Sequence, residues 1–437
     1  MKVCVLGLGY IGLPTAVMLA SAGHDVVGVD VKEEILEAVG NGNSHIDEPG
    51  LAKLLEKVVS SGKLVVSPHP LESDAFIIAV PTPLASRELR DKSRSLEVDN
   101  RLSTLDSGLS TLDFPHCDLS YVKSASASIA PVLRRGNLVV LESTSPPGTT
   151  QDVLAPILEE GSGLKTGDEF HLAYCPERVL PGKILKEIVH NARIIGGIDR
   201  RSAEMAKELY SSFVKGEIHL TDTRTAEMVK LAENTYRDVN IAFANELSRI
   251  CNRVGVDVWE VIELANLHPR VNILRPGPGV GGHCIAVDPW FIVESAPEEA
   301  KLIRVAREVN DSQPEYIFER IKELVKGIEN PKIAVLGIAY KGNVGDTRES
   351  PALKVVEFLK TEGYEVAIYD PYVRGYESSE GVFEKADCMA VLVDHNQFRE
   401  IAPEKISSVV RSKLAFDAKA VLDRERWEQA GFKVETV

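Results

Sequence analysis

The stretch that decides the fold is Lys2–Asp30, KVCVLGLGYIGLPTAVMLASAGHDVVGVD. It opens with a short apolar run, which is typical of a parallel strand buried on both faces. The glycines Gly7, Gly9 and Gly12 follow, then a helical pattern, then a second apolar run that ends on Asp30. This order of strand, glycine-rich turn, helix, strand and acid predicts a dinucleotide-binding βαβ unit.

The predicted ligand of this unit is NAD. Glycines allow a tight turn and bring backbone amides close to a pyrophosphate at the helix N-terminus. Asp30 is placed to accept a hydrogen bond from a ribose 2′-hydroxyl and would repel a 2′-phosphate, which favours NAD over NADP. The expected cofactor contacts here are Gly7, Gly9, Tyr10, Ile11, Gly12 and Asp30. The alternative is a glycine-rich turn in a sheet that binds no nucleotide.

Two further apolar runs, 75–80 and 138–142, predict strands that each lead into a turn containing proline and threonine. Ligands of open α/β sheets lie beyond the carboxyl ends of the strands. Pro81, Thr82 and Thr144 are in these turns and are therefore candidate ligand contacts. The alternative is that the turns only terminate strands.

Composition excludes several classes of function. The 437 residues carry a net charge of −15, which argues against a nucleic-acid partner. Six scattered cysteines show neither metal-ligand spacing nor a disulfide framework, so we expect no metal site and a reducing, cytoplasmic location. No apolar run reaches the roughly 18 residues that a membrane-spanning helix needs, and we expect no membrane partner.

The rest of the chain predicts a long helix and a second α/β unit. Residues 222–254 carry one helical pattern, long enough to indicate a connecting or dimer-forming helix. Another strand–turn–helix–strand pattern begins at Lys332 and reaches Asp370, but its first turn lacks the full glycine fingerprint. Lys341 and Arg348 in its loops suit the diphosphate of a nucleotide substrate, with solvated surface charge as the alternative.

These patterns predict three domains. Residues 1–198 form an NAD-binding Rossmann domain whose last strand is expected at the apolar run 193–197. A polar insertion to which no chemistry is assigned interrupts this domain at 84–115. Residues 199–312 form a central helical dimerisation region, and residues 313–437 form a second Rossmann-like domain. The predicted fold class is α/β, with two Rossmann-like doubly wound domains joined by a long central helix.

The glycine- and proline-rich loop 275–289, RPGPGVGGHCIAVDP, carries the candidate nucleophile Cys284 with Asp288 four residues later. A thiol presented by a glycine-lined loop beside a carboxylate suggests covalent catalysis. The alternative is a small buried cysteine, the usual fate of a free thiol. Lys230 and Asn234 stand one turn apart on the long helix, either aimed into a cleft or simply exposed.

Six motifs resemble those of the UDP-sugar dehydrogenases of the UDP-glucose/GDP-mannose dehydrogenase family, and the match covers nearly all of the chain outside 84–115. They are GLGYIGLPTA at 7–16, ESTSPPGT at 142–149, YCPERVLPGK at 174–183, LAENTYRDVNIAFANE at 231–246, GPGVGGHCIAVDP at 277–289 and AYKGNVGDTRESPA at 339–352. The resemblance implies NAD on the first domain, a UDP-sugar-binding C-terminal domain with the sugar between the two, and a homodimer or higher homo-oligomer built on the long helix.

The resemblance also implies a four-electron oxidation of a primary alcohol to a carboxylate with two NAD. Cys284 would hold the aldehyde as a thiohemiacetal and then as a thioester. Lys230 and Asn234 resemble the pair that stabilises the oxyanion, whereas Asp288 and Glu177 resemble the carboxylates that move protons and activate water. Thr144 resembles a hydroxyl that holds water and cofactor.

The substrate contacts implied by the resemblance include an arginine, Arg270, that reaches the substrate of the neighbouring subunit. The expected set is Glu177, Arg178, Val179, Lys230, Asn234, His268, Arg270, Gly281, Tyr340 and Lys341, while Arg348 is expected to contact the cofactor. Arg178 and Val179 after Glu177 resemble the branch that oxidises UDP-N-acetylmannosamine. UDP-N-acetylglucosamine and UDP-glucose are the alternative substrates.

Two rival functions remain at this point. A one-step β-hydroxyacid dehydrogenase shares the first domain and the long helix, but it needs neither a catalytic cysteine nor a second nucleotide-binding domain. A non-catalytic sensor of NAD or UDP-sugars would bind its ligands without producing NADH.

Overall fold

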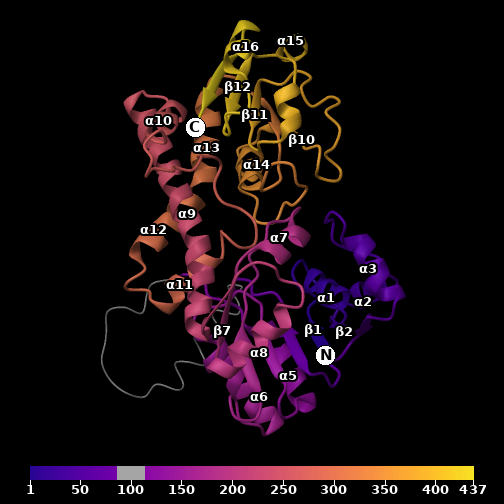
Figure 1. Ribbon diagram of the computed structural model, residues 1–437. Coiled ribbons are helices and arrows are strands. Elements are labelled where there is room, and N and C mark those ends of the chain that lie inside the picture. Colours follow the sequence, from indigo (N-terminus) through magenta and orange to yellow (C-terminus); the bar gives the residue numbers. More distant parts are fainter. Residues whose placement is uncertain (86–113) are drawn as a thin grey trace. The chain divides into compact units, whose positions relative to one another are not determined.

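The structure is a computed structural model that describes residues 1–85 and 114–437. Most of the predicted insertion, residues 86–113, therefore lies outside the described residues. Contacts divide the chain into two compact units, residues 1–233 with 290–297 and residues 234–289 with 298–437 (Figure 1). The three domain boundaries stay a prediction. Within the described ranges, no helix combines the length and the apolar character needed to cross a membrane.

The first unit is built on one eight-stranded sheet with the order β3-β2-β1-β4-β5-β6-β7-β8. All neighbouring strands are parallel except β6 and β7. The strands are β1 (Lys2–Leu6), β2 (Asp25–Val29), β3 (Leu64–Ser67), β4 (Ala75–Ile78), β5 (Leu138–Leu141), β6 (His171–Tyr174), β7 (Arg193–Gly197) and β8 (Ile218–Asp222).

Helices cover both faces of this sheet, because alternate strand residues supply two separate cores. Val3 and Val5 of β1 pack into one cluster, and Cys4 and Leu6 pack into the other. The helices are α1 (Gly12–Ser21), α2 (Glu33–Gly40), α3 (Leu51–Ser60), α5 (Ser120–Ile129), α6 (Ala155–Ser162), α7 (Ile184–His190) and α8 (Arg200–Tyr210), with the 3-10 turn η1 (Ala130–Val132) and the π-helical turn η2 (Thr149–Leu154).

One expectation for this sheet is wrong. The apolar run 193–197 was expected to be the last strand of the first domain, but the sheet continues to β8. Strand β8 has the sequence IHLTD and no buried residue, because it lies at the edge of the sheet, so its hydrophobic signal is weak. The expected strands 75–80 and 138–142 end slightly earlier, at Ile78 and Leu141.

The long helix is confirmed as α9 (Thr223–Val254). It begins in the first unit and continues into the second. The helices that follow in the chain are α10 (Val258–Ala265), α11 (Asp288–Ser295), α12 (Lys301–Asp311) and α13 (Gln313–Leu324).

The second unit contains a five-stranded parallel sheet with the order β10-β9-β11-β12-β13. Alternate residues of β9 again face two cores, Ile333 and Val335 on one side and Ala334 and Leu336 on the other. Its elements are β9 (Lys332–Leu336), α14 (Pro351–Thr361), β10 (Glu365–Tyr369), β11 (Cys388–Val391), η3 (Asn396–Glu400), α15 (Pro403–Ile406), β12 (Leu414–Asp417), α16 (Arg424–Gln429) and β13 (Lys433–Thr436). Two Rossmann-like doubly wound sheets and a long helix confirm the predicted fold class.

Candidate active site

The turn between β1 and α1 has the form that a dinucleotide requires. Gly7 has φ +89°, and its amide donates to the carbonyl of Val29 over 2.8 Å. A Cβ on Gly12 would lie 1.8 Å from the carbonyl oxygen of Gly7, so only glycine fits there. A Cβ on Gly9 would meet no atom of residues 1–85 or 114–437 within 4 Å. Gly7 and Gly12 therefore shape the turn, while Gly9 faces open space in which a pyrophosphate fits.

The other residues expected at the cofactor lie around the same turn. The N-cap position of α1 is Ile11, whose side chain makes no capping hydrogen bond, and the neighbouring Tyr10 is exposed. Asp30 accepts from the amides of Leu8 over 2.9 Å and Lys32 over 3.0 Å, and it is only partly buried. A carboxylate oxygen has more than one acceptor position, so Asp30 can still accept from a ribose hydroxyl.

Hydrogen bonds tie together the turns after β4 and β5. Thr82 donates from Oγ1 to the carbonyl of Thr144 over 2.7 Å, and Ser143 donates from Oγ to the carbonyl of Val80 over 2.7 Å. Pro81 precedes this link and is exposed. The expected cofactor contacts Thr82 and Thr144 are thus neighbours at the carboxyl edge of the sheet, where Rossmann folds bind ligands.

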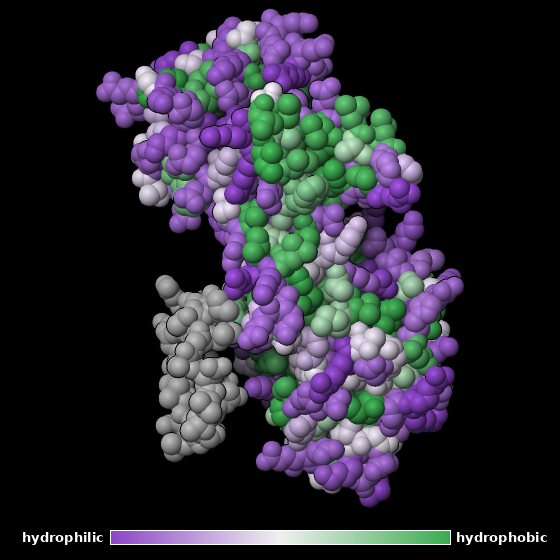
Figure 2. All heavy atoms as spheres, turned by 90° about the vertical axis from the view of Figure 1, so that its left-hand side faces the viewer, coloured by the Kyte–Doolittle hydropathy of each residue, from purple (hydrophilic) through white to green (hydrophobic). Residues whose placement is uncertain are grey.

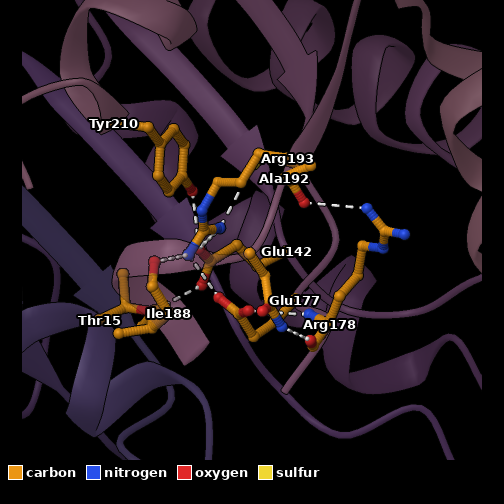
Figure 3. A network of polar contacts seen from close by, with 10 residues as sticks. Thr15, Glu142, Glu177, Arg178, Ile188, Ala192, Arg193 and Tyr210 are labelled. Atoms are coloured by element: carbon orange, nitrogen blue, oxygen red, sulfur yellow. Dashed lines mark hydrogen bonds and ion pairs between the residues drawn. The ribbon is translucent and has the colours of Figure 1, made fainter. Parts of the chain in front are cut away.

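Glu177 lies in the loop after β6 and is held on both carboxylate oxygens (Figure 3). Nη2 of Arg193, the first residue of β7, lies 2.5 Å from Oε2. The amide of Arg178 donates to Oε1 over 2.8 Å. Arg193 and Glu177 are both buried.

A second buried carboxylate, Glu142 at the end of β5, shares Arg193. Its Oε1 lies 3.9 Å from Nη1 of Arg193 and accepts from the hydroxyl of Tyr210 over 2.7 Å, while Thr15 donates to Oε2 over 3.2 Å. Complete burial raises the pKa of Glu142 to about 7, and the charge of Glu177 adds to this rise, although Arg193 and the two hydroxyls act against it.

Arg178 and Val179 follow Glu177 but have structural contacts of their own. The guanidinium of Arg178 contacts both oxygens of Glu233, at 2.9 and 2.5 Å, and donates to the carbonyl of Ala192 over 2.9 Å. Val179 packs against the hydrophobic core. Their expected contact with substrate stays a prediction, and for Arg178 it requires sharing a guanidinium that already makes three contacts, two with Glu233 and one with Ala192.

Lys230 lies on α9 and is 9% exposed. Within residues 1–85 and 114–437, no hydrogen-bond acceptor or carboxylate pairs with its ammonium group. One turn earlier, the buried Glu227 accepts from the amides of Gly148 and Thr150, which anchors α9 to the turn that follows β5. A nearly buried ammonium without an internal partner is suited to an anionic oxygen supplied by a ligand.

The second unit brings Asn234, Cys284 and Asp288 together. Nδ2 of Asn234, on α9, donates to Oδ2 of Asp288 over 2.6 Å, and both side chains are buried. The amide of Asp288, at the start of α11, donates to the carbonyl of Cys284 over 2.8 Å. Cys284 itself is exposed. The expected nucleophile is therefore open to a ligand and sits one turn from a buried carboxylate.

The loop that carries Cys284 packs against the first loop of the C-terminal sheet. A Cβ on Gly281 would lie 2.6 Å from the carbonyl oxygen of Glu349 and 2.8 Å from Cβ of Tyr340. Gly282 has φ +80°, and its amide donates to the carbonyl of Arg348 over 3.0 Å. Glycine is needed at 281 because the loop backbones approach closely, and at 282 because of the positive φ and the nearby ring of Tyr340.

The remaining expected contacts lie on exposed loops. Lys341 follows Tyr340 and is exposed, and Arg348 forms a two-pronged ion pair with Asp346. His268 and Arg270 are exposed after α10, where the amide of Arg270 donates to Nδ1 of His268 over 3.3 Å. Their contacts with a ligand stay predictions. In the part of the chain that the structure describes, no three His, Cys, Asp or Glu side chains converge as a metal site.

The sequence patterns missed Glu142, Arg193 and Tyr210. Arg193 was taken only as the first residue of a strand, and Glu142 only as the last residue of another. The available signal was a charged residue at the end of an otherwise apolar strand, RIIGG or LVVLE. A charge in such a place is buried only when it has a partner.

Comparisons with known proteins agree with this geometry. Residues 1–214 match the NAD binding domain of the UDP-glucose/GDP-mannose dehydrogenase family, residues 224–312 its central domain and residues 334–424 its UDP binding domain. The chain is 49% identical to the UDP-N-acetyl-D-mannosamine dehydrogenase of Methanococcus maripaludis over 99% of this chain and 96% of that protein.

Two further relatives extend the comparison. The NDP-N-acetyl-D-galactosaminuronic acid dehydrogenase of Ralstonia nicotianae is 46% identical over 93% of this chain and 94% of its own. The solved structure of UDP-D-ManNAc dehydrogenase from Pyrococcus horikoshii is 44% identical, with a TM-score of 0.90 over 100% of this chain and 99% of that chain. The chain therefore belongs to the UDP-glucose/GDP-mannose dehydrogenase family and is an NAD-dependent UDP-sugar dehydrogenase.

Proposed function

We propose that the enzyme oxidises the C6 hydroxyl of UDP-N-acetylmannosamine to the carboxylate in two steps, through covalent intermediates on Cys284. The observation that carries this proposal is the grouping of an exposed Cys284 with the buried pair of Asn234 and Asp288. A one-step alcohol dehydrogenase has no use for a nucleophile in this place. Bound NAD, two molecules per sugar, supplies the acceptor for two hydrides.

The two oxidations and the hydrolysis together release two hydrides and three protons. The C6 alcohol loses a hydride and a proton to become an aldehyde, and the Cys284 thiol adds to it as a thiohemiacetal. Loss of a second hydride and a proton leaves a thioester, and water then displaces the thiol and releases the carboxylate with one more proton. Covalent capture keeps the reactive aldehyde in the site between the two oxidations.

The other residues have roles that follow from charge and position. Lys230, nearly buried and without a partner among the described residues, and Asn234, an amide donor, stabilise the oxyanions that form at C6. Glu177 and Asp288 are the carboxylates that accept protons and activate water, and Thr144 orients water and cofactor. Both carboxylates are buried and held by hydrogen-bond donors.

The choice of sugar rests on the relatives from Methanococcus and Pyrococcus, which are named for mannosamine. The test is the yield of NADH from a limiting amount of UDP-N-acetylmannosamine, with UDP-N-acetylglucosamine, UDP-glucose and UDP-N-acetylgalactosamine run beside it. The last sugar is included because the Ralstonia relative is named for a galactosaminuronic acid. Two NADH per mannosamine sugar and slower turnover of the others are expected. One NADH per sugar, or preference for another sugar, contradicts the proposal.

We also propose that the enzyme is a homodimer that associates through α9. Tyr236, Phe243 and Ile250 repeat every seven residues, lie on one side of the helix and are 66%, 51% and 50% exposed. Figure 2 looks at the side of the molecule that carries α9 and shows a band of apolar atoms there. A second copy of this chain is the occupant that the family resemblance implies, and Arg270 would then reach the substrate of the partner.

Sedimentation of the Phe243→Asp variant tests this dimer. The variant is expected to be monomeric, while Leu71→Asp, which also places a charge at an exposed apolar position, keeps the mass of the native protein. A Phe243→Asp variant that sediments like the native protein contradicts the proposed interface.

We further place the reaction in the cytoplasm. Four of the six cysteines, Cys4, Cys175, Cys251 and Cys388, are free and buried, as expected for a protein of a reducing compartment. Recovery of the protein from the periplasmic or extracellular fraction of its cells would contradict this assignment.

A further inference from the structure

The buried group around Arg193 contains three charges. A single guanidinium lies between the carboxylates of Glu177, at 2.5 Å, and Glu142, at 3.9 Å. The guanidinium also lies over the rings of Tyr210, 4.8 Å from the centroid, and Phe213, 5.6 Å from the centroid. These rings and the two carboxylates fix the guanidinium in one orientation.

This arrangement acts on Glu177 in particular. Its Oε2 is held by Arg193 and its Oε1 by the amide of Arg178, so the carboxylate cannot rotate without losing a hydrogen bond. Each oxygen keeps one further acceptor position. Figure 3 shows Arg193 reaching Glu177 from the strand behind it, while Arg178 points away toward Ala192. A general base needs this kind of fixed direction toward the proton that it removes.

We propose that Arg193 is a positioning residue for the oxidation, because its guanidinium fixes the direction of the Glu177 carboxylate. This inference rests on the proposed function, in which Glu177 moves protons. Arg193 affects the reaction by orienting Glu177, and it does not contact the sugar itself. A guanidinium can hold both carboxylates at once with separate nitrogens, which the single ammonium of a lysine cannot do.

Glu142 makes the inference measurable, since it competes for the same guanidinium. The groups that face Glu142 are Arg193, Glu177, Tyr210 and Thr15. Burial also raises the pKa of the nearby Cys175 thiol to about 12, so this thiol stays neutral. With a pKa of about 7, Glu142 is neutral below that pH, and Arg193 then pairs with Glu177 alone. Above it, Glu142 is an anion that draws Arg193 toward itself.

A pH profile of kcat therefore separates positioning from a purely structural ion pair. We expect the native enzyme to show an ionisation near pH 7 in kcat that Glu142→Gln removes, because glutamine keeps the shape of the side chain but does not titrate. The pH profile of kcat for the Glu142→Gln variant then shows only the ionisations of the other groups. An unchanged ionisation near pH 7 in Glu142→Gln overturns the coupling of Glu142 to the site.

The second measurement is a double-mutant cycle between Arg193 and Glu177, with UDP-N-acetylmannosamine as substrate. Arg193→Lys is expected to lower kcat by about 10- to 100-fold while the KM values for NAD and sugar change by less than about threefold. In the Glu177→Gln background, the same change is expected to lower kcat by less than about twofold, since the carboxylate that it positions is gone. Equal losses in both backgrounds overturn the inference.

A matched control uses another arginine in an ion pair. Arg320, on α13, donates to Glu435 over 3.0 Å and to the hydroxyl of Tyr316 over 3.4 Å, and it lies over the ring of Phe416. Among the described residues, none of these partners is a candidate site residue. Arg320→Lys is expected to leave kcat within about twofold of native. If the native enzyme forms NADH but Arg193→Lys behaves like Arg320→Lys, this inference fails alone. If no UDP-sugar yields NADH, the proposed function fails and the inference fails with it.

Discussion

The two Rossmann-like units begin with the same pattern and use it differently. Residues 7–12 read GLGYIG and residues 337–342 read GIAYKG. Gly7 and Gly337 have φ +89° and +88°, and each donates its amide to the last residue of the next strand, over 2.8 and 2.9 Å. In both units an acid follows that strand, Asp30 or Asp370. The two turns therefore begin with the same backbone conformation and the same hydrogen bond.

The two acids differ in what they can still bind. Asp370 is fully buried and accepts from the amides of Ile338, Ala339 and Tyr372, at 2.8, 3.0 and 3.0 Å. Its fourth partner is Nε2 of His395 at 3.1 Å. Nδ1 of that ring accepts from the amide of Asn343 over 2.8 Å, so Nε2 carries the proton and donates. Four donors fill the acceptor positions of one carboxylate.

The second difference lies in the turn itself. The position of the open Gly9 is taken by Ala339, which is 1% exposed. The first unit therefore leaves both the acid and the middle of the turn free for a dinucleotide, whereas the second uses both to stabilise itself. The same strand–turn–helix–strand pattern leaves room for a ligand in the first unit, whereas in the second unit its turn and its acid make internal contacts that stabilise the fold.

The largest expected effect is on stability, from Asp370→Ala. The change leaves His395, two buried amides and one partly buried amide without an acceptor, and we expect it to lower the free energy of unfolding by about 3 to 5 kcal/mol. Asp30→Ala frees only the amides of Leu8 and Lys32, and that of Lys32 is exposed to water, so the change is expected to cost about 1 to 2 kcal/mol. Urea unfolding followed by circular dichroism measures both. Equal costs would show that the two acids have the same function.

The pH dependence of stability distinguishes two buried carboxylates. Burial raises the pKa of Glu142 from 4.5 to about 7, so the folded state holds a proton that the unfolded state has lost. Stability from this group therefore falls as pH rises from 4.5 to 7, by about 3 kcal/mol in total. In Glu142→Gln, this fall in the free energy of unfolding between pH 4.5 and 7 is expected to disappear.

Asp370 is expected to behave in the opposite sense. Burial alone would raise its pKa, but the hydrogen bonds from His395 and the backbone amides outweigh burial and lower the pKa below 3.8. Its contribution is complete above pH 3.8 and is lost as pH falls through the lowered pKa. Thermal unfolding between pH 3 and 8 measures both trends, and a native protein that gains stability from pH 4.5 to 7 while Glu142→Gln does not would contradict the assignment for Glu142.

A smaller effect is expected on cofactor binding from Asp30→Ala. Loss of one hydrogen bond from a charged acceptor to the ribose is expected to raise the KM for NAD by about 10- to 100-fold and to reduce the preference over NADP. The KM for the UDP-sugar is expected to stay unchanged, because only the first unit loses its acid. Initial-rate kinetics with each cofactor measure this, and an unchanged KM for NAD would remove Asp30 from the cofactor site.

The smallest effect is expected from Gly9→Ala, which makes the first turn resemble the second. The new methyl group meets no atom of the described residues within 4 Å, so stability is expected to change by less than about 0.5 kcal/mol. It would occupy the space left for the pyrophosphate, and the KM for NAD is expected to rise by about tenfold. A large loss of stability would mean that Gly9 serves the fold and not the ligand.

The sequence alone predicted the parts of the molecule that repeat a local pattern. Apolar runs, the glycine fingerprint and the helical pattern 222–254 predicted the first two strands of each glycine-turn unit and α9, because burial on both faces and helix periodicity give clear sequence patterns. Strands β3, β12 and β13 were not predicted. Strand β8 was missed because an edge strand has a weak hydrophobic pattern. The grouping of Arg193 with Glu142 and Glu177 could not be predicted, since strand pairing brings together residues 16 and 51 positions apart along the chain.

The most direct test of the two-step oxidation uses the Cys284→Ala variant with limiting UDP-N-acetylmannosamine and excess NAD. Without the thiol, no thiohemiacetal or thioester forms at this position, so we expect at most one NADH per sugar and no uronate in the products. The native enzyme beside it is expected to give two NADH and one uronate. Two NADH per sugar and a full yield of uronate from Cys284→Ala would contradict the role of Cys284 and the covalent route with it.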